Sequence, residues 1–238
     1  MDSTGFVTLN RQAGLLKELE TVAQNIANMS TNGYRREGVV FSEFVVRTGR
    51  ASESLSMAHA NGRASDLSQG ALMQTNGTFD MAIEGPGFFL VATPDGDRLT
   101  RAGSFTPSPD GLLVSPDGAS LLDAGGAPVF VPADAAQIAI GADGTVSADG
   151  NPIAQIGLWA PADPLAMTRD KGVRFNSGDA PVPVENGRIL QGFVERSNAD
   201  PVRELTRMIE VQRAYELGRT FLDREDERVR AAIRTIGQ

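Results

Sequence analysis

The sequence predicts a mainly β fold with a long α-helix at each end, and three patterns support this. Apolar residues recur at helical spacing from about residue 3 to 29, and they do so again from 202 to 236. The stretch between them is rich in Gly, Asp and Pro, and its short apolar runs alternate as strands do. We therefore expect a central antiparallel β domain, barrel-like or sandwich-like, between two terminal helices.

The first helix is expected to begin near Asp2, Ser3 or Thr4, any of which can serve as its N-cap. It should end near Met29, because the Ser-Thr-Asn-Gly turn at 30–33 supplies the positive φ that closes a helix. The apolar positions of this helix are Phe6, Leu9, Ala13, Leu16, Leu19, Ala23 and Ile26.

The sequence does not settle the secondary structure of the segment after this helix. Residues 39–46 are mostly apolar and fit either a strand or a second short helix. From about residue 47 to 69, small and polar residues dominate, which indicates an extended linker or a long loop. His59, the only His of the chain, falls in this stretch.

The central strands are expected from about Leu72 onward. Short apolar runs are separated by five Asp-Gly pairs, and Asp-Gly between apolar runs is a strong hairpin signal because a type I′ turn needs positive φ at both central residues. The pairs are Asp95-Gly96, Asp110-Gly111, Asp117-Gly118, Asp143-Gly144 and Asp149-Gly150. The pattern predicts many short antiparallel strands.

The last helix is expected to begin after Asn198 or Asp200, which can cap it, with Pro201 in its first turn. Its apolar positions are Leu205, Met208, Ile209, Tyr215, Leu222, Val229, Ile233 and Ile236. Opposite charges at i,i+3 are expected to pair along its surface: Glu204 with Arg207, Glu210 with Arg213, and Glu216 with Arg219.

Composition narrows the function classes. The net charge of −8 and the aromatic content of 6% argue against nucleic-acid binding. Residues 51–201 carry a net charge of −10, whereas residues 1–50 and 202–238 each carry +1, so the helical ends can pack beside copies of themselves without strong repulsion. The absence of Cys excludes disulfides and zinc–thiolate sites. We expect no membrane insertion and no cleaved signal peptide.

No catalytic constellation is evident, and we expect neither an enzyme nor a bound cofactor or metal. His59 lacks a patterned carboxylate or nucleophile, so an exposed loop His is the better interpretation. The Asp residues beside Gly are better explained by turns than by acid–base chemistry. Asp143-Gly144-Thr145 and Asp149-Gly150-Asn151 do not meet the ligand spacing of a calcium loop.

The terminal helices admit two interpretations. Amphipathic helices usually bury their apolar face in their own chain, which would make a self-contained monomer. However, the apolar residues of the last helix spread over more than one face, with Val211, Ala214, Leu217 and Phe221 beside the main stripe. That spread favours helices whose contacts are completed by neighbouring molecules.

Several stretches, in this order along the chain, resemble bacterial flagellar basal-body rod and hook axial proteins. They are 27–36 (ANMSTNGYRR), 79–89 (FDMAIEGPGFF), 100–105 (TRAGSF) with 110–114 (DGLLV), and 192–198 (GFVERSN) with 208–216 (MIEVQRAYE). The short chain resembles the proximal rod members most, and the distal rod members next.

The resemblance implies a structural subunit of the flagellar rod whose terminal helices pair as a coiled-coil-like axial domain. It implies three regions: 1–34 with 200–238 as the assembly domain, 35–71 as a linker, and 72–199 as an outward-facing β domain. It also implies export by the flagellar type III apparatus, a periplasmic place in the basal body, and contacts with copies of itself and other rod proteins. The residues expected at the assembly interface are the apolar helical positions Leu16, Leu19, Ala23, Ile26, Leu205, Met208, Ile209 and Leu222, together with Asn28, Thr31, Gly33, Tyr34, Gln212, Arg213 and Tyr215, which the resemblance implies.

Two other functions remain as alternatives. One is a self-contained β-domain binding module for a cell-wall or surface ligand, with helices that only close the fold. A hydrolase acting on peptidoglycan would suit the same location, but the sequence lacks the catalytic residues for it.

Overall fold

The computed structural model describes residues 3–47 and 54–236. The chain divides into two compact units, each assembled from separate stretches of sequence. Unit 1 comprises Met1–Asn28, Arg36–Asp66 and Ala199–Gln238, and unit 2 comprises Met29–Arg35 and Leu67–Asn198. The chain therefore leaves and re-enters unit 1 twice.

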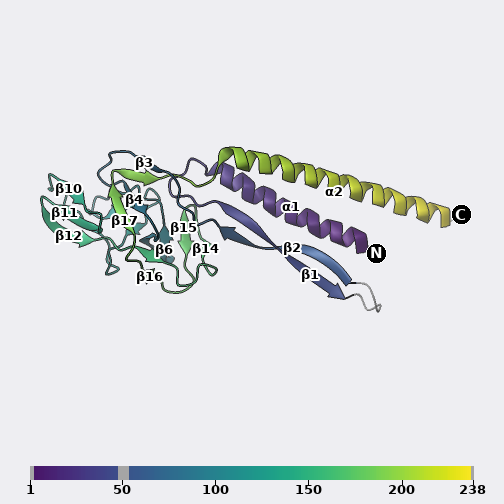
Figure 1. The fold of residues 1–238 in the computed structure, drawn as a ribbon, viewed down its shortest axis with the longest axis horizontal. Coiled ribbons are helices and arrows are strands. Elements are labelled where there is room, and N and C mark those ends of the chain that lie inside the picture. Colours follow the sequence, from purple (N-terminus) through teal and green to yellow (C-terminus); the bar gives the residue numbers. More distant parts are fainter. Residues whose placement is uncertain (1–2, 48–53, 237–238) are drawn as a thin grey trace. The chain divides into compact units, whose positions relative to one another are not determined.

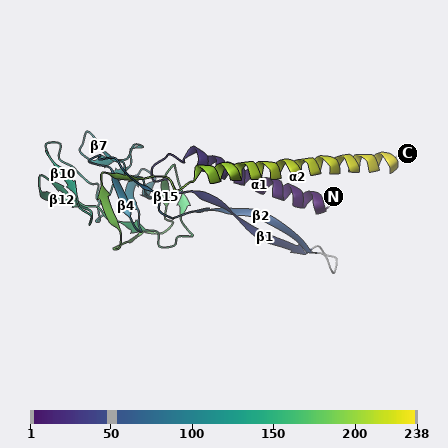
Figure 2. The same cartoon turned by 45° about the horizontal axis from the view of Figure 1, so that its top comes forward.

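Unit 1 contains the two long helices that the sequence predicts, α1 (Ser3–Ala27) and α2 (Pro201–Ile236). They lie side by side and antiparallel, with α2 extending beyond the start of α1 (Figures 1 and 2). The start of α2 confirms the predicted cap, because Asp200 Oδ1 accepts hydrogen bonds from the backbone N–H groups of Val202 at 2.8 Å and Arg203 at 3.1 Å.

The segment expected to be a linker is instead largely a β ribbon. β1 (Glu37–Arg47) and β2 (Ser54–Ser65) pair antiparallel, with one register shift between Val40 and Phe41. The apolar run of β1 is thus a strand, and His59 lies in β2 opposite Ser42 rather than in a loop. The small polar residues of β2 hid this strand, because they form it by pairing with β1 and packing beside α1 rather than by intrinsic propensity.

Unit 2 is built from many short strands, as predicted. One sheet has seven strands in the order β14-β15-β6-β5-β9-β8-β7, a second has the order β10-β11-β12, and three antiparallel pairs are β13-β16, β17-β4 and β18-β3. The strands are β3 (Leu72–Gln74), β4 (Met81–Glu84), β5 (Phe89–Thr93), β6 (Gly96–Thr100), β7 (Thr106–Pro107), β8 (Leu113–Val114), β9 (Ser120–Leu121), β10 (Ile138–Ile140), β11 (Thr145–Ala148), β12 (Asn151–Gln155), β13 (Trp159–Ala160), β14 (Thr168–Arg169), β15 (Arg174–Asn176), β16 (Val182–Pro183), β17 (Arg188–Gln191) and β18 (Phe193–Glu195).

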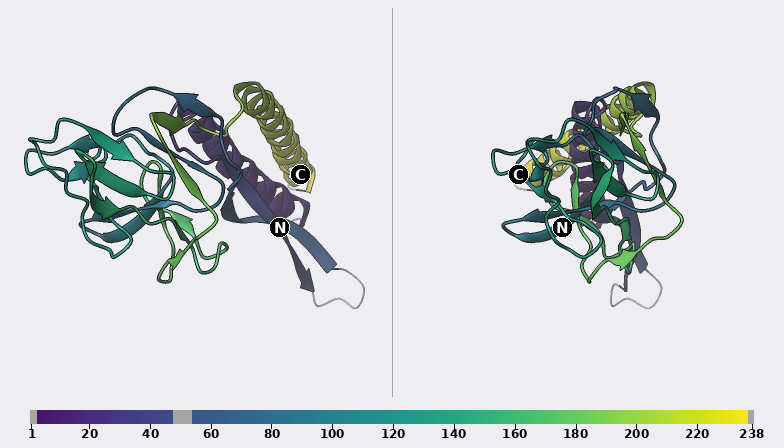
Figure 3. Two further views of the ribbon diagram at one scale, coloured as in Figure 1. Left: turned by 60° about the vertical axis from the view of Figure 1, so that its left-hand side comes forward. Right: turned by 90° about the vertical axis from the view of Figure 1, so that its left-hand side faces the viewer.

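A closed barrel, which is one of the two forms predicted for the β domain, does not form. The strands of unit 2 belong to separate sheets that do not close into a cylinder (Figure 3). Many of them are two to four residues long, and a closed barrel needs longer strands with a continuous stagger of hydrogen bonds. The unit is held instead by an apolar core in which Met81, Ile83, Phe89, Leu113 and Val146 are buried among their neighbours.

The Asp-Gly pairs do mark hairpin turns, but only one has the predicted type I′ geometry. Asp149 and Gly150 join β11 to β12 with φ of 50° and 83°, so both central residues are left-handed. In the other four pairs the Gly has positive φ and the Asp does not. At these four positions only the glycine is left-handed, as in a hairpin whose turn is followed by a bulge with a left-handed glycine.

Candidate assembly interface

The face of α1 that packs within unit 1 is mostly polar. Along the part of α1 whose side chains are described, residues 7–27, the buried positions recur at helical spacing. They are Gln12, Gly14, Glu18, Thr21, Val22 and Asn25. Because buried polar groups need hydrogen-bond partners, each of the long polar side chains here must find one.

Gln12 finds its partner on the backbone of α2. Its Nε2 donates to the carbonyl oxygen of Tyr215 at 2.9 Å. The approach depends on Gly218, because a Cβ at that position would lie 2.0 Å from Gln12 Nε2. A glycine inside a helix costs about 1 kcal/mol relative to Ala, and here it leaves room for a contact between the two helices.

Glu18 forms the second contact between the helices. Arg207 donates from Nε to Glu18 Oε1 at 2.6 Å and from Nη1 to Glu210 Oε2 at 3.1 Å. Burial lowers the pKa of Arg207, but the hydrogen bonds to Glu18 and Glu210 raise it more, so its pKa lies above the ordinary value. Arg207 is therefore a fixed positive charge between two carboxylates.

Asn25 and Glu204 form the third contact, which also includes the start of β1. Asn25 exchanges hydrogen bonds with the backbone of Glu37, donating from Nδ2 to its carbonyl at 2.8 Å and accepting from its N–H at 3.0 Å. Asn25 Nδ2 also donates to Glu204 Oε2 at 3.0 Å, and Arg36 Nε donates to the other oxygen of Glu204. Asn25 and Glu204 have no solvent exposure.

These contacts correct the expected pairing of Glu204 with Arg207. Glu204 binds Arg36 and Asn25, whereas Arg207 binds Glu18 and Glu210. Glu204 thus bonds to other segments, whereas Arg207 bonds both to Glu18 on α1 and to Glu210 one turn along α2. The i,i+3 rule assumes an exposed helix surface, and these two residues lie where a second helix offers better partners.

Many of the large apolar side chains of α1 and α2 lie on the outside of unit 1. Leu217 is 73% exposed and Leu205 is 52% exposed, and others on both helices are similarly open. The exposed large apolar residues of the two helices are Leu9, Leu16, Val202, Leu205, Ile209, Leu217, Phe221, Val229 and Ile233. Scattered apolar residues on a surface are normal, but a run of this kind along two adjacent helices indicates a binding surface.

Most helical residues assigned to assembly from the sequence lie at this surface or at its edge. Leu16, Ala23, Leu205, Ile209, Gln212 and Arg213 are exposed, and Leu19, Ile26, Met208, Tyr215 and Leu222 are half-buried. Asn28 and Thr31 are also half-buried, and Asn28 Nδ2 donates to the Gln24 carbonyl at 2.8 Å at the end of α1. Val211, which the sequence placed beside the apolar stripe, is buried within unit 1.

Gly33 and Tyr34 lie elsewhere, enclosed in unit 2. The Gly33 N–H donates to the Glu195 carbonyl at 2.7 Å, and a Cβ at Gly33 would lie 2.2 Å from the backbone nitrogen of Ala102. Tyr34 has no solvent exposure, and the guanidinium of Arg169 stacks 4.4 Å from its ring centre. This turn is therefore occupied by contacts within its own unit.

Glu195 is the charged centre of that turn. Its Oε1 binds Arg35 Nη1 at 2.6 Å and the Gly70 N–H at 2.7 Å, and its Oε2 binds Arg101 Nη1 at 3.1 Å. All three charged side chains are buried. Burial lowers the pKa of Arg101 to about 10, which Glu195 opposes and Arg35 reinforces, so Arg101 stays protonated at neutral pH.

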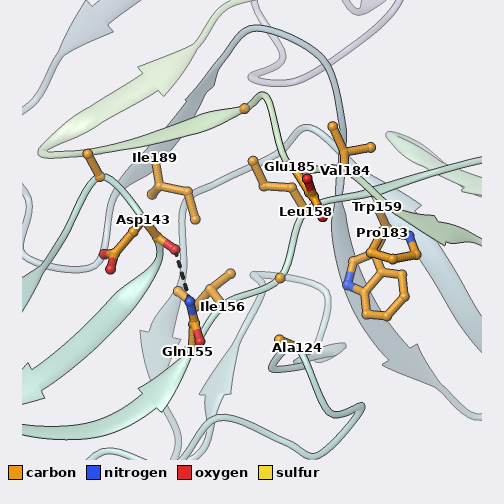
Figure 4. A pocket seen from close by; sticks show the side chains of 13 residues that line it. Ala124, Asp143, Gln155, Ile156, Leu158, Trp159, Pro183, Val184, Glu185 and Ile189 are labelled. Carbon is orange, nitrogen blue, oxygen red and sulfur yellow. Dashed lines mark hydrogen bonds between the residues drawn. The ribbon is translucent and has the colours of Figure 1, made fainter.

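The pocket beside Asp143 in unit 2 contains two carboxylates in its lining. This pocket of about 360 Å³ is lined by Asp143, Glu185 and Trp159 over an apolar floor (Figure 4). Asp143 accepts hydrogen bonds from the N–H of Thr145 at 3.1 Å and from its hydroxyl at 2.8 Å, and these lower its pKa. A general acid needs a raised pKa, so this carboxylate serves its turn rather than acid catalysis.

Within the described ranges, no group of three or more His, Cys, Asp or Glu side chains is placed to hold a metal ion. No helix in those ranges combines the length and hydropathy that a membrane span requires.

Comparison with known proteins places the chain in a family. Residues 7–35 match the flagella basal body rod protein family, residues 82–148 the flagellar hook protein FlgE/F/G D1 domain, and residues 190–235 the flagellar basal body rod FlgEFG protein C-terminal region. The flagellar basal-body rod protein FlgF of Caulobacter vibrioides is 38% identical, and the alignment covers 100% of this chain and 99% of the relative. The chain belongs to the flagellar basal-body rod protein family.

Other relatives agree with this assignment. FlgF of Mesorhizobium japonicum is 37% identical over 100% of this chain and 99% of its own length. FlgG of Bacillus subtilis is 32% identical over 88% of this chain and 90% of its own length. This rod-family chain is thus a structural protein of the flagellum, as the resemblance in its sequence implied.

The polar residues between α1 and α2 were not predicted as part of the interface. Gln12, Glu18, Thr21 and Asn25 recur at helical spacing as clearly as the apolar stripe does. That periodicity was the available signal. The signal is weak because an amphipathic helix normally turns its apolar side, not its polar side, toward its own chain.

Proposed function

We propose that this chain polymerises through the exposed apolar faces of α1 and α2 into the axial rod of the flagellar basal body, which crosses the periplasm and transmits torque. The observation that carries this is the arrangement of α1 and α2, which face each other with polar residues and expose apolar ones. We call this arrangement the inverted helix pair. Polar side chains make the contacts within unit 1, and large apolar side chains such as Leu217 and Ile209 remain outside. Burying one such side chain at a contact contributes about 1.5–3 kcal/mol.

The division of charge supports the same proposal. Residues 51–201 carry a net charge of −10, whereas the sequences at both ends are close to neutral. Copies can therefore associate through the helices while the acidic β unit remains solvated on the outside of the polymer. The partners would be copies of this chain and other rod proteins.

Export and position complete the proposal. The absence of Cys suits a subunit that leaves the cell through the flagellar type III apparatus without a cleaved signal peptide. Relatives named FlgF align over the whole chain, whereas the Bacillus subtilis FlgG covers 88% of it, which favours the proximal over the distal rod position.

The test is Ile209→Asp in cells that lack the natural gene. Ile209 is half exposed, so an Asp there should change the stability of the single chain by at most about 0.5 kcal/mol. It would place a charge in the helix contact, and we expect basal bodies without complete rods and loss of swimming. Leu165→Asp is the matched control, because Leu165 is also exposed but lies in unit 2.

The outcomes separate the alternatives. Hydrogen exchange on the purified Ile209→Asp chain should show unit 2 as protected as in the natural chain. Complete rods assembled from Ile209→Asp, or complete rods in cells lacking the gene, would refute the proposal. A self-contained binding module would instead tolerate Ile209→Asp and show both helices strongly protected in the dilute natural chain.

A further inference from the structure

The inverted helix pair raises a question that its apolar surface does not answer: what determines the register of α1 against α2. Apolar contacts are not directional, so a helix pair held by them alone tolerates sliding by a turn and exchange of partners. The pair here is held by polar contacts at three levels along α1, at Gln12, Glu18 and Asn25.

The three contacts require one alignment. Gln12 needs both the carbonyl of Tyr215 and the space beside Gly218, which occur together at one position of α2. Glu18 needs Arg207, and Asn25 needs Glu204, nearer the start of α2. Moving α1 by one turn, about 5.4 Å, would separate all three pairs at once.

The cost of a wrong alignment is larger than the benefit of the right one. A satisfied hydrogen bond contributes little net stability, whereas a buried polar group left without a partner costs its full desolvation. Glu204 illustrates this, because it is fully buried and both of its oxygens are bound, by Arg36 and by Asn25. A buried polar group of this kind specifies register more than it stabilises.

The third contact also includes the chain that follows α1. Arg36 and the backbone of Glu37 join the same cluster, and both lie at the entry to β1. The cluster therefore aligns α1, the start of β1 and the start of α2 together. In this alignment Leu16 and Ile209 lie on the outer surface of unit 1.

We propose that the contacts of Gln12 with Tyr215, Glu18 with Arg207, and Glu204 with Asn25 and Arg36 fix the register of α1 against α2 within one subunit, and so determine which apolar residues are presented to neighbouring subunits. This inference rests on the proposed rod function. Gln12, Glu18, Asn25, Arg36, Glu204 and Arg207 are positioning residues in it. The neighbour they prepare for is another axial subunit.

The Glu18–Arg207 contact allows the sharpest test, because Arg207 is partly exposed and its charge can be reversed without burying it. Cells lacking the natural gene would express Glu18→Arg, Arg207→Glu, the double reversal in one chain, or the two single variants together. We expect each single variant to lower the yield of complete basal bodies at least tenfold. The double reversal in one chain should recover most of that yield.

Co-expression of the single variants decides whether the contact lies within one subunit. Each single-variant chain lacks the partner in itself and could find it only in the other chain. We expect no recovery from the mixture. Recovery equal to that of the double reversal would place the contact between subunits and overturn the proposal.

A second measurement distinguishes register from ordinary stability. Circular dichroism and urea unfolding of the purified Arg207→Glu variant should stay close to the natural chain, because the Arg207 side chain is 47% exposed and solvent screens its charge. If a single variant lost helix content and basal-body yield to the same extent, the contact would have a structural role only, and the proposal would be overturned. A yield of complete basal bodies equal to that of the natural chain, from either single variant, would also overturn it. Reversing Arg228 with Glu225, an exposed pair along α2, is the control and should change neither measurement.

The rod function itself has a separate outcome. If cells lacking the gene still build complete rods, the proposed function fails regardless of the variants. If the rods need the chain and the single variants assemble normally, only the register proposal fails.

Discussion

The two units of this protein use their apolar residues in opposite ways. In unit 2 the large apolar side chains are enclosed, and Phe89, Leu99, Leu113 and Phe175 have no solvent exposure. In unit 1 the buried positions are largely polar, and the large apolar side chains of α1 and α2 lie outside. Unit 2 therefore satisfies the usual rule for a self-contained domain, and unit 1 does not.

The difference teaches what each unit depends on. An apolar core stabilises unit 2 by removing carbon from water, which needs no other molecule. In unit 1 the exposed apolar side chains of α1 and α2 do not stabilise the single chain in this way, and under the proposed function they do so in contacts with neighbouring subunits. The polar contacts inside it supply direction and register at small net energy. Predictions about single residues should therefore differ sharply between the units.

The largest expected effect is a core truncation in unit 2. Phe89→Ala should lower the free energy of unfolding by about 3–5 kcal/mol, because it removes a fully buried ring and leaves a cavity. Leu217→Ala in unit 1 should change the same quantity by less than about 0.5 kcal/mol. Urea unfolding of the dilute chain, followed residue by residue by hydrogen exchange, measures both. Similar losses of unfolding free energy for the two variants would show that the two units do not differ in where their apolar side chains stabilise the chain.

A buried charge gives the next effect. Glu195→Gln should cost about 3 kcal/mol, since Arg35 and Arg101 would keep their charges in the interior of unit 2 without the carboxylate that balances them. Glu18→Gln in unit 1 should cost about 1 kcal/mol or less, because its partner Arg207 is partly exposed. Thermal unfolding at low concentration compares the two, and equal effects would show that burial does not separate these ion pairs.

The turn at Gly33 tests whether close packing within unit 2 adds to the cost of a glycine substitution. Gly33→Ala should destabilise unit 2 by at least about 2 kcal/mol, because a Cβ would meet the backbone of Ala102 in addition to the strain of positive φ. Gly118→Ala is the matched control, with a φ of 83° and open space around it, and should cost about 1 kcal/mol. Equal losses of stability for the two variants would mean that Gly33 does not pack closely against the backbone of Ala102.

The smallest effect concerns pH. The hydrogen bonds from Thr145 lower the folded-state pKa of Asp143, so its contribution to stability is present above the unfolded pKa of about 3.8 and is lost as the pH falls through the folded value. Asp143→Asn should therefore unfold with a slightly weaker dependence on pH in the acid range than the natural chain. Urea midpoints measured from about pH 5 to pH 2 test this, and an unchanged acid dependence would contradict it.

Local patterns were sufficient for much of the fold. The helical repeats predicted α1 and α2, and the Asp200–Pro201 signal predicted the start of α2, because these are properties of neighbouring residues. Asp-Gly pairs predicted hairpins for the same reason. Their turn type was missed at four of five positions, because the φ of the Asp depends on how the flanking strands pair.

The residues expected at the assembly interface from the sequence remain predictions, and they do not include the polar residues that join α1 to α2. Leu16, Leu205 and Ile209 were identified from spacing, and they are exposed. The roles of Asn25, Arg36 and Glu204 could not be read from the sequence, because those residues meet only when distant segments fold together.

The sequence by itself determined the family, the helical ends, the β-rich centre and the uneven charge, since each of these is carried by adjacent residues or by composition. The tertiary structure decided which side of α1 faces α2, that β1 and β2 form a ribbon, and that Tyr34 and Arg35 belong to unit 2. The physical reason is that periodicity shows that a helix has two faces, whereas only the partners available in space decide which face is buried.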